Sequence, residues 1–315
     1  MSVNAKDETI KKYLEGFYLG GEEWNKETLR RFKSEGRKRF PEWMAFMEST
    51  KAIRDNYSQS EIDQIAKGSR IIPTRTKTIS MQGNHVRFAF ITDTHMGGTC
   101  FHQDVWEAIV KEINTSNVDM IFHTGDVVDG TNSSRMDCIY DLTHIGYSAQ
   151  KEYAIENLSM LEAPIYAVSG NHDRWYIKSA GARIVDDIAN NVPNMTFLGD
   201  DMADFIIENG ERPIRIRLWH GEDGSSYATS YRVQKLVESF SGGDKPSILL
   251  CGHTHKQIAM VERNIECISG GAVCFQSNWM RSKKMANHTG FYIVDFTFNE
   301  RGIVKFSPTW YPFYS

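Results

Sequence analysis

Short apolar runs alternate with amphipathic segments along most of the chain. From His85 onward the runs VRFAFI, VDMIFH and PIYAVS are separated by helix-like patterns near residues 103–115 and 148–161. Strands that alternate with helices in this way are typical of βαβ units and a parallel sheet. The later runs IRIRLW, SILLC, QIAMV, IECIS and FYIVDFTF have less helix between them, which predicts a second, more antiparallel sheet.

The amino-terminal part of the chain follows a helical period instead. An apolar stripe at i, i+3, i+4, i+7 and i+8 predicts a helix that ends at Gly20-Gly21, and its members are Ile10, Tyr13, Leu14, Phe17 and Tyr18. Further helices are expected over 22–39 and after the capping box Ser58-Gln-Ser-Glu61. Alternating β-branched residues begin at Thr74, so we expect a helical extension at 1–75 and a second domain at 76–315.

Composition agrees with a folded protein. The chain has 315 residues, of which 41% are hydrophobic and 24% charged, values that disfavour disorder and predict one or two folded units. No apolar run approaches the ~20 residues that span a bilayer, and the first residues lack the apolar core of a signal peptide. Five cysteines without a CxxC pair suit a reducing compartment. We therefore expect a cytoplasmic protein without a membrane partner.

Charge is distributed unevenly. Residues 1–80 carry 16 Lys and Arg against 12 Asp and Glu, whereas the remainder carries 20 against 28. One stretch of the basic part is interleaved with the aromatic residues Trp24, Phe32 and Phe40, and its cations are Arg30, Arg31, Lys33, Arg37, Lys38 and Arg39. Such a pattern could follow a nucleic-acid backbone. A helical appendage that packs on the catalytic body or on a partner chain is the favoured interpretation.

Candidate metal ligands occur in five short clusters, each directly after an apolar run. The clusters are Asp93-Thr-His95, Gly125-Asp126, Gly170-Asn171-His172-Asp173, His220-Gly221 and Gly252-His253-Thr-His255. Each is expected at the carboxyl end of a strand, where the loops of an open α/β sheet converge on a ligand. A single Asp-x-His or Gly-Asp is usually a turn, but five clusters in order point to one site.

The order DxH, GD, GNH[DE], His-Gly and GHxH resembles the calcineurin-like metallophosphoesterase family over about residues 85–310. The resemblance implies a four-layered α/β/β/α sandwich. The opening Asp-Thr-His-Met-Gly is also similar to the start of the Mre11/SbcD nuclease branch, although the longer capping region of those nucleases is not evident.

The resemblance further implies two metal ions. Asp93, His95, Asp126 and His255 would hold the first, while Asp126, Asn171, His220 and His253 would hold the second, so that Asp126 bridges. Mixed oxygen and nitrogen donors suit Mn, Fe, Zn or Ni better than Mg or Ca, and we expect Mn. Two such ions would supply a hydroxide nucleophile from water.

Two neighbouring residues are expected to be catalytic. As in the family, His172 would contact the phosphate and help to protonate the leaving oxygen, with Asp173 fixing its tautomer and raising its pKa. Outside the clusters we expect His123 to be packed, Asp129 to cap a loop, and Cys100 to be a small buried residue without a second thiol nearby.

These features predict metal-dependent hydrolysis of a phosphoester. A nucleic-acid phosphodiester is the favoured substrate; small phosphomonoesters, cyclic nucleotides, nucleotide-linked lipid precursors and phosphoproteins stay open, because the ligand set leaves the leaving group undefined. A non-catalytic scaffold is disfavoured since no ligand is missing. A nucleic-acid-binding module with a vestigial metal centre is a third possibility.

Overall fold

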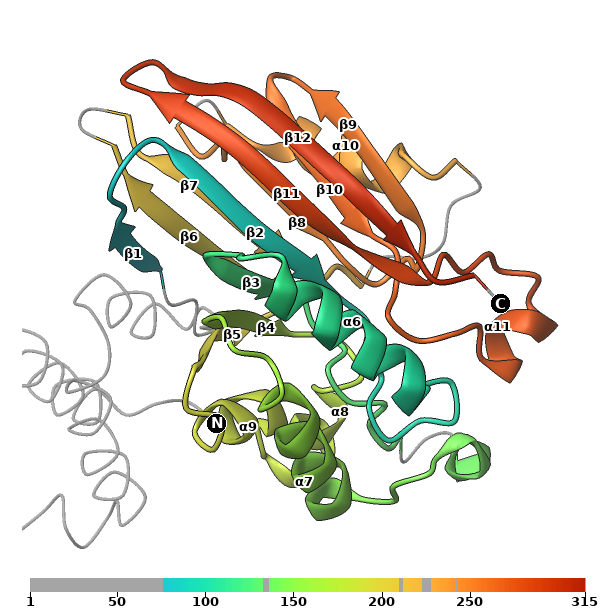
Figure 1. Cartoon of the computed structure of the whole chain (residues 1–315). Helices are drawn as coiled ribbons and strands as arrows, with labels where there is room; N and C mark the ends of the chain where they lie inside the picture. The colour runs from blue at the N-terminus through green and yellow to red at the C-terminus, as the bar shows by residue number, and fades with distance from the viewer. Residues whose placement is uncertain (1–75, 133–135, 210–211, 223–227, 242, 315) are drawn as a thin grey trace, which may run out of the picture. The chain divides into compact units, whose positions relative to one another are not determined.

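The computed structural model describes residues 76–132, 136–209, 212–222, 228–241 and 243–314 (Figure 1). The helices expected within residues 1–75, and the basic stretch they contain, lie outside the described residues. Among the described residues, no helix is long and apolar enough to cross a membrane.

The first sheet has six strands in the order β12-β11-β2-β3-β4-β5. Its parallel part consists of β2 (His85–Ile91), β3 (Met120–His123), β4 (Ile165–Ser169) and β5 (Met195–Asp200). Helices α6 (Gln103–Thr115), α7 (Tyr147–Leu158), α8 (Trp175–Ala180) and α9 (Ile184–Ala189) lie in the crossovers between these strands. The βαβ pattern read from the sequence is thereby confirmed.

The second sheet has the order β1-β6-β7-β8-β10-β9. Its strands are β1 (Lys77–Ser80), β6 (Met202–Glu208), β7 (Ile214–Trp219), β8 (Ile248–Cys251), β9 (Gln257–Glu262) and β10 (Ile265–Gly270). The expectation of a mainly antiparallel sheet is wrong for its centre, because β8 runs parallel to both β7 and β10. Helix α10 (Tyr231–Ser239) lies in the β7–β8 crossover, and a parallel pair requires such a long connection.

The last apolar run also departs from expectation. Strand β11 (Gly290–Asn299) joins the first sheet by pairing antiparallel with β2, and β12 (Gly302–Pro312) pairs with its other side. Seven of the ten residues of β11 are buried, because the strand contributes to both faces of that sheet. Short helix α11 (Asn278–Ser282) lies between β10 and β11.

Alternation along the central strands builds two cores. Phe88 and Phe90 of β2 pack between the sheets against side chains such as Phe205, whereas Ala89 and Ile91 face the helices on the other side. The buried stripe of α6, which includes Trp106 and Ile109, covers that outer face together with α7 and α9. Val233 and Val237 of α10 cover the outer face of the second sheet. The four-layered α/β/β/α sandwich is therefore confirmed.

Candidate dinuclear metal centre

All seven predicted metal ligands lie in loops that leave strands at their carboxyl ends, and the structure brings them together. Asp93, His95, Asp126 and Asn171 follow β2, β3 and β4 of the first sheet, while His220, His253 and His255 follow β7 and β8 of the second. Several contacts join the two sheets at this edge. The His253 N–H donates to the Asp93 carboxylate at 2.9 Å, and His220 Nδ1 lies 2.8 Å from the Thr124 carbonyl oxygen.

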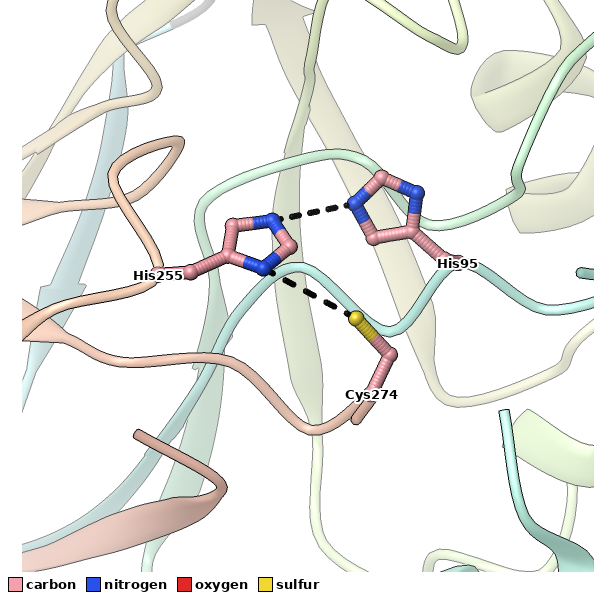
Figure 2. Close-up of side chains that lie close together, drawn as sticks. All are labelled: His95, His255 and Cys274. Carbon is pink, nitrogen blue, oxygen red and sulfur yellow. Dashed lines mark hydrogen bonds between the residues drawn. The ribbon is translucent and has the colours of Figure 1, made fainter. Parts of the chain in front are cut away.

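One group of donors surrounds His255. Its Nε2 atom lies 3.3 Å from Asp93 Oδ1 and 3.3 Å from His95 Nε2 (Figure 2). Asp93 is completely buried and the two histidines are nearly so. Three side chains from both sheets thus direct donor atoms at one another in the interior.

A second group surrounds His220. Its Nε2 atom lies 2.9 Å from Asn171 Oδ1 and 3.3 Å from Asp126 Oδ2. Donor atoms of Asp126, His220 and His253 all lie within 4.8 Å of one another. The same Asp126 Oδ2 is 3.7 Å from His95 Nε2 of the first group, so this carboxylate lies between the two groups.

The backbone at these residues is unusual. Five of the seven have positive φ angles: Asp93 (51°), His95 (49°), Asp126 (52°), His253 (69°) and His255 (54°). Non-glycine residues seldom adopt this left-handed region, and each such conformation costs free energy that surrounding structure must outweigh. The sharp turns direct donor atoms back over the strand ends.

Two glycines let the loops approach each other. A Cβ atom at Gly170 would lie 2.2 Å from Asp126 Oδ1, and one at Gly125 would lie 2.4 Å from the Gly170 nitrogen. Neither distance is compatible with a side chain larger than hydrogen. The Gly-Asp and Gly-Asn-His clusters therefore need glycine for close packing beside Asp126.

Opposite charges in this buried cluster shift one another's pKa values. Burial raises the pKa of Asp93, but the adjacent His255 outweighs this effect and lowers it to about 2. Burial lowers the pKa of His95 and of His220, yet neighbouring carboxylates outweigh it and raise these values to about 10 and about 9. Protons thus balance the buried carboxylates here, and divalent cations would do so with better geometry. The mixed carboxylate, amide and imidazole donors fit two such ions.

His172 lies beside the donor groups. Its backbone N–H donates to Asp126 Oδ1 at 2.8 Å, and its ring Nδ1 lies 2.6 Å from the carbonyl oxygen of Asp129. The ring packs against Trp175 at a centroid distance of 4.0 Å. A carbonyl can only accept, so Nδ1 carries the proton and Nε2 is left for a substrate.

The role predicted for Asp173 is wrong. Its carboxylate accepts hydrogen bonds from the backbone nitrogens of Gly170, Val127 and Val128 at 2.8, 3.2 and 3.0 Å, and none of these partners is the His172 ring. Burial lowers the pKa of His172, opposite to the predicted direction. Burial also raises the pKa of Asp173 to about 7. Asp173 therefore fixes the loops after β3 and β4, and the Asp129 carbonyl orients His172.

The sequence did not predict the two residues that orient histidines of the centre. Asp129 was expected to cap a loop, but its Oδ1 lies 2.8 Å from His95 Nδ1. Asn287 Oδ1 lies 2.8 Å from His255 Nδ1. Partners of this kind set the ring orientation and tautomer of a metal-binding histidine. Asp129 carried a signal, being three residues after Asp126, whereas Asn287 follows no motif.

Cysteine placement also differs from expectation. Cys274 Sγ lies 3.8 Å from His255 Nδ1 (Figure 2), and the next residue, Phe275, donates its N–H to the Cys100 carbonyl oxygen at 2.8 Å. Cys100 therefore does have a second thiol nearby. The expectation for His123 is confirmed, because this fully buried ring contacts Thr94 and accepts from the Gly125 N–H.

A cavity of about 380 Å³ opens onto the centre. Its walls include His95, Asp126, Asn171, His172, His253 and His255. The lining also includes the cations Arg232 and Lys256 and the aromatic residues Trp175 and Trp279. The cavity thus combines candidate metal ligands with groups that can contact an anionic, aromatic molecule.

Comparison with known proteins gives one family and several solved structures. The model of the calcineurin-like phosphoesterases matches residues 86–257. An archaeal phosphodiesterase has a TM-score of 0.43 and 16% identity, and the match covers 71% of this chain and 99% of that one. A conserved protein from Streptococcus pneumoniae, described as a predicted phosphoesterase, has a TM-score of 0.36 and 17% identity, and the match covers 73% of this chain and 100% of that one. Vps29 from Entamoeba histolytica in complex with Zn²⁺ has a TM-score of 0.35 and 13% identity, and the match covers 71% of this chain and 98% of that one. No curated protein sequence matches the chain.

Proposed function

The chain belongs to the calcineurin-like phosphoesterase family and is a hydrolase of phosphoric esters, and we propose that its substrate is a nucleic-acid phosphodiester. The family uses divalent metal ions, and the buried donor groups around Asp126 carry the proposal. No other described group of side chains combines so many converging donors with an adjoining cavity.

The proposed ligands are those placed at the joint edge of the two sheets. Asp93, His95, Asp126 and His255 would hold one ion, and Asp126, Asn171, His220 and His253 would hold the other. Manganese is the proposed metal. Two divalent ions in such a site lower the pKa of water to near neutrality and polarise the phosphoryl oxygens.

The protein's own residues prepare the substrate. His172 lines the cavity, and its Nε2 is the ring nitrogen left for the substrate because the Nδ1 proton is held by the Asp129 carbonyl. When Nε2 is protonated, the ring can donate to a phosphoryl or leaving-group oxygen. Asp129 fixes the orientation of the His95 ring, and Asn287 fixes that of the His255 ring. Asp173 holds together the loops that carry Asp126 and His172.

Groups on the cavity wall support the choice of a nucleic-acid diester. Arg232 and Lys256 supply positive charge, and Trp175 and Trp279 supply aromatic faces. Cations bind phosphates, and aromatic rings stack on bases. The Asp-Thr-His-Met-Gly segment and the basic stretch at Arg30–Arg39 agree with this choice.

A small phosphoester is the second candidate, favoured by the size of the cavity. About 380 Å³ lies within the range of pockets that enclose a single small molecule. A nucleotide or another small phosphoester would fit such a space. A cytoplasmic location stays a prediction for either substrate.

The first test measures turnover with added Mn²⁺ on a chromogenic diester, a chromogenic monoester, and single- and double-stranded DNA. We expect diester cleavage, with DNA the better substrate. Preference for the monoester, or failure on both DNAs with turnover of the small diester, would favour the second candidate.

Asp126→Asn provides the matched variant. Because Asp126 Oδ2 lies between both donor groups, its loss should lower the content of both ions together with turnover. Elemental analysis measures the metals. A variant that kept two ions and near-normal turnover would contradict the bridging role.

A further inference from the structure

Two thiols beside the first donor group have no role in the function proposed above. Cys100 lies in the loop after β2 and Cys274 follows β10, and burial together with the Cys100 thiol raises the pKa of Cys274. Their chain segments are also joined directly, because the Phe275 N–H donates to the Cys100 carbonyl oxygen at 2.8 Å. Both residues line the cavity.

We propose that Cys100 and Cys274 are a site of oxidative modification, at which a hydroperoxide converts the two thiols into a reversible disulfide that disables the adjoining metal centre. The bond itself depends only on the two cysteines. Its effect on metal binding rests on the function proposed above.

The geometry suits a disulfide. Such a bond requires sulfurs ~2.05 Å apart and Cα atoms within roughly 4.4–6.8 Å. The 2.8 Å hydrogen bond from the Phe275 N–H to the Cys100 carbonyl oxygen keeps the segments that carry the two cysteines adjacent, and both side chains line the same cavity. A small oxidant can reach Cys100, because this residue is partly exposed at the cavity. Cys274 is only 1% exposed, so Cys100 is the thiol that would react first.

The other described cysteines differ from this pair. Cys251 and Cys267 are buried in the core beneath α10. Cys138 is partly exposed and lines the same cavity, which makes it a matched control for access by the oxidant.

The reaction balances with a hydroperoxide as the oxidant. The Cys100 sulfur attacks the terminal peroxide oxygen, the O–O bond breaks, and an alcohol or water leaves as Cys100 becomes a sulfenic acid. The Cys274 sulfur then attacks the Cys100 sulfur, the S–O bond breaks, and the hydroxyl leaves as water with a thiol proton. The two thiols lose two electrons in total, which reduce the peroxide.

Oxidation would reach the metal centre through Cys274. Its N–H donates to the Asp93 carbonyl oxygen at 3.2 Å, and its own carbonyl accepts from Asn287 Nδ2 at 3.0 Å. Asn287 in turn orients His255, whose Nδ1 lies 3.8 Å from the Cys274 sulfur (Figure 2). Moving Cys274 toward Cys100 therefore disturbs two proposed ligands of one ion, and residues in such orienting positions are typically worth ~10–100-fold in metal affinity.

The modification is tested on the full-length, metal-free protein. After treatment with hydrogen peroxide, non-reducing peptide mapping should show Cys100 linked to Cys274, and dithiothreitol should reverse the link. Cys100→Ser and Cys274→Ser should abolish it, and Cys138→Ser should leave it unchanged. Absence of the linked peptide in the wild type, or linkage of Cys100 to Cys138 instead, would overturn the proposal.

The consequence is tested by metal titration of the same samples. Affinity for one of the two ions should fall ~10–100-fold on oxidation and recover on reduction, whereas Cys100→Ala treated in parallel should keep its affinity. Unchanged metal affinity in the disulfide form would overturn the coupling. Peptide mapping needs neither metal nor substrate. The disulfide can therefore be detected even if the protein turns out not to hydrolyse phosphoesters.

Discussion

At the scale of single residues, the orientation of His172 decides what this side chain can do. Its Nδ1 proton is held by a backbone carbonyl, so the chemistry is left to Nε2. We expect His172→Ala to retain both metal ions and to lower kcat by ~10²–10⁴-fold, as is typical for a general acid. The loss should shrink for a diester with a nitrophenolate leaving group, which needs little protonation.

Steady-state kinetics on good and poor leaving groups, with metal content measured in parallel, check this prediction. His85→Ala is the matched control, since that exposed ring pairs with Asp295 on the sheet surface. An equal loss on both leaving groups would reassign His172 to phosphate binding.

Asp129 acts on the centre through His95. Removing its carboxylate deprives His95 Nδ1 of its 2.8 Å partner, so Asp129→Ala should lower metal affinity by ~10–100-fold. Asp129→Asn, which keeps an acceptor oxygen, should lose less. Calorimetric titration with Mn²⁺ measures both variants, and equal affinities in wild type and Asp129→Ala would assign the carboxylate no part in metal binding.

At the scale of elements, the loops that carry the ligands leave no room for change. A Cβ atom at Gly170 would overlap Asp126, so Gly170→Ala should displace the proposed bridging carboxylate and reduce metal content and turnover together. Gly243→Ala is the control, because a Cβ atom there would have no neighbour within 4 Å and the φ angle of Gly243 is not positive. Normal metal content in Gly170→Ala would show that the β3 and β4 loops can separate.

The sequence predicted the elements better than their pairing. Strands β2, β3 and β4 of the first sheet were identifiable because apolar runs and helical periods alternate there, and the motifs placed ligands after those runs. Strand direction in the second sheet was not identifiable, because β8 is buried on both faces and such a run has the same appearance in either direction. The joining of β11 to β2 depends on residues about 200 positions apart, which no local pattern reveals.

The same limit applies within the site. Motif residues were found, while their partners were missed or misassigned: Asp129, Asn287 and Cys274 contact the ligand rings across sequence separations of 34, 32 and 19 residues. Asp173 was misassigned because adjacency in sequence suggested contact with His172. The tight turn sends the two side chains to different partners.

At the scale of the whole molecule, the basic amino-terminal stretch separates the two candidate substrates. If Arg30, Arg31, Arg37 and Arg39 contact a nucleic-acid backbone, replacing all four with Gln should weaken DNA binding. The replacement should also flatten its dependence on salt by ~0.7–0.9 in log–log slope per lost contact. Turnover of a small chromogenic diester should be largely retained, because every proposed ligand lies beyond residue 92.

Binding isotherms at several salt concentrations provide the measurement. If the fourfold variant kept the DNA affinity and the salt slope of the wild type, the stretch would have a structural role. A small phosphoester would then be the favoured substrate.

The centre draws its donors from both sheets, and this has a consequence for the protein's lifetime. Ions that bind only the native state stabilise it by RT ln(1 + [L]/Kd), about 2.7 kcal/mol at a hundredfold excess over Kd. Without them, the edge where His220 and His253 meet Asp126 and Asp93 keeps buried carboxylates balanced by protons alone. Chains starved of metal would open there more often and be degraded by proteases sooner, so that supply of the ion would set the amount of the protein as well as its activity.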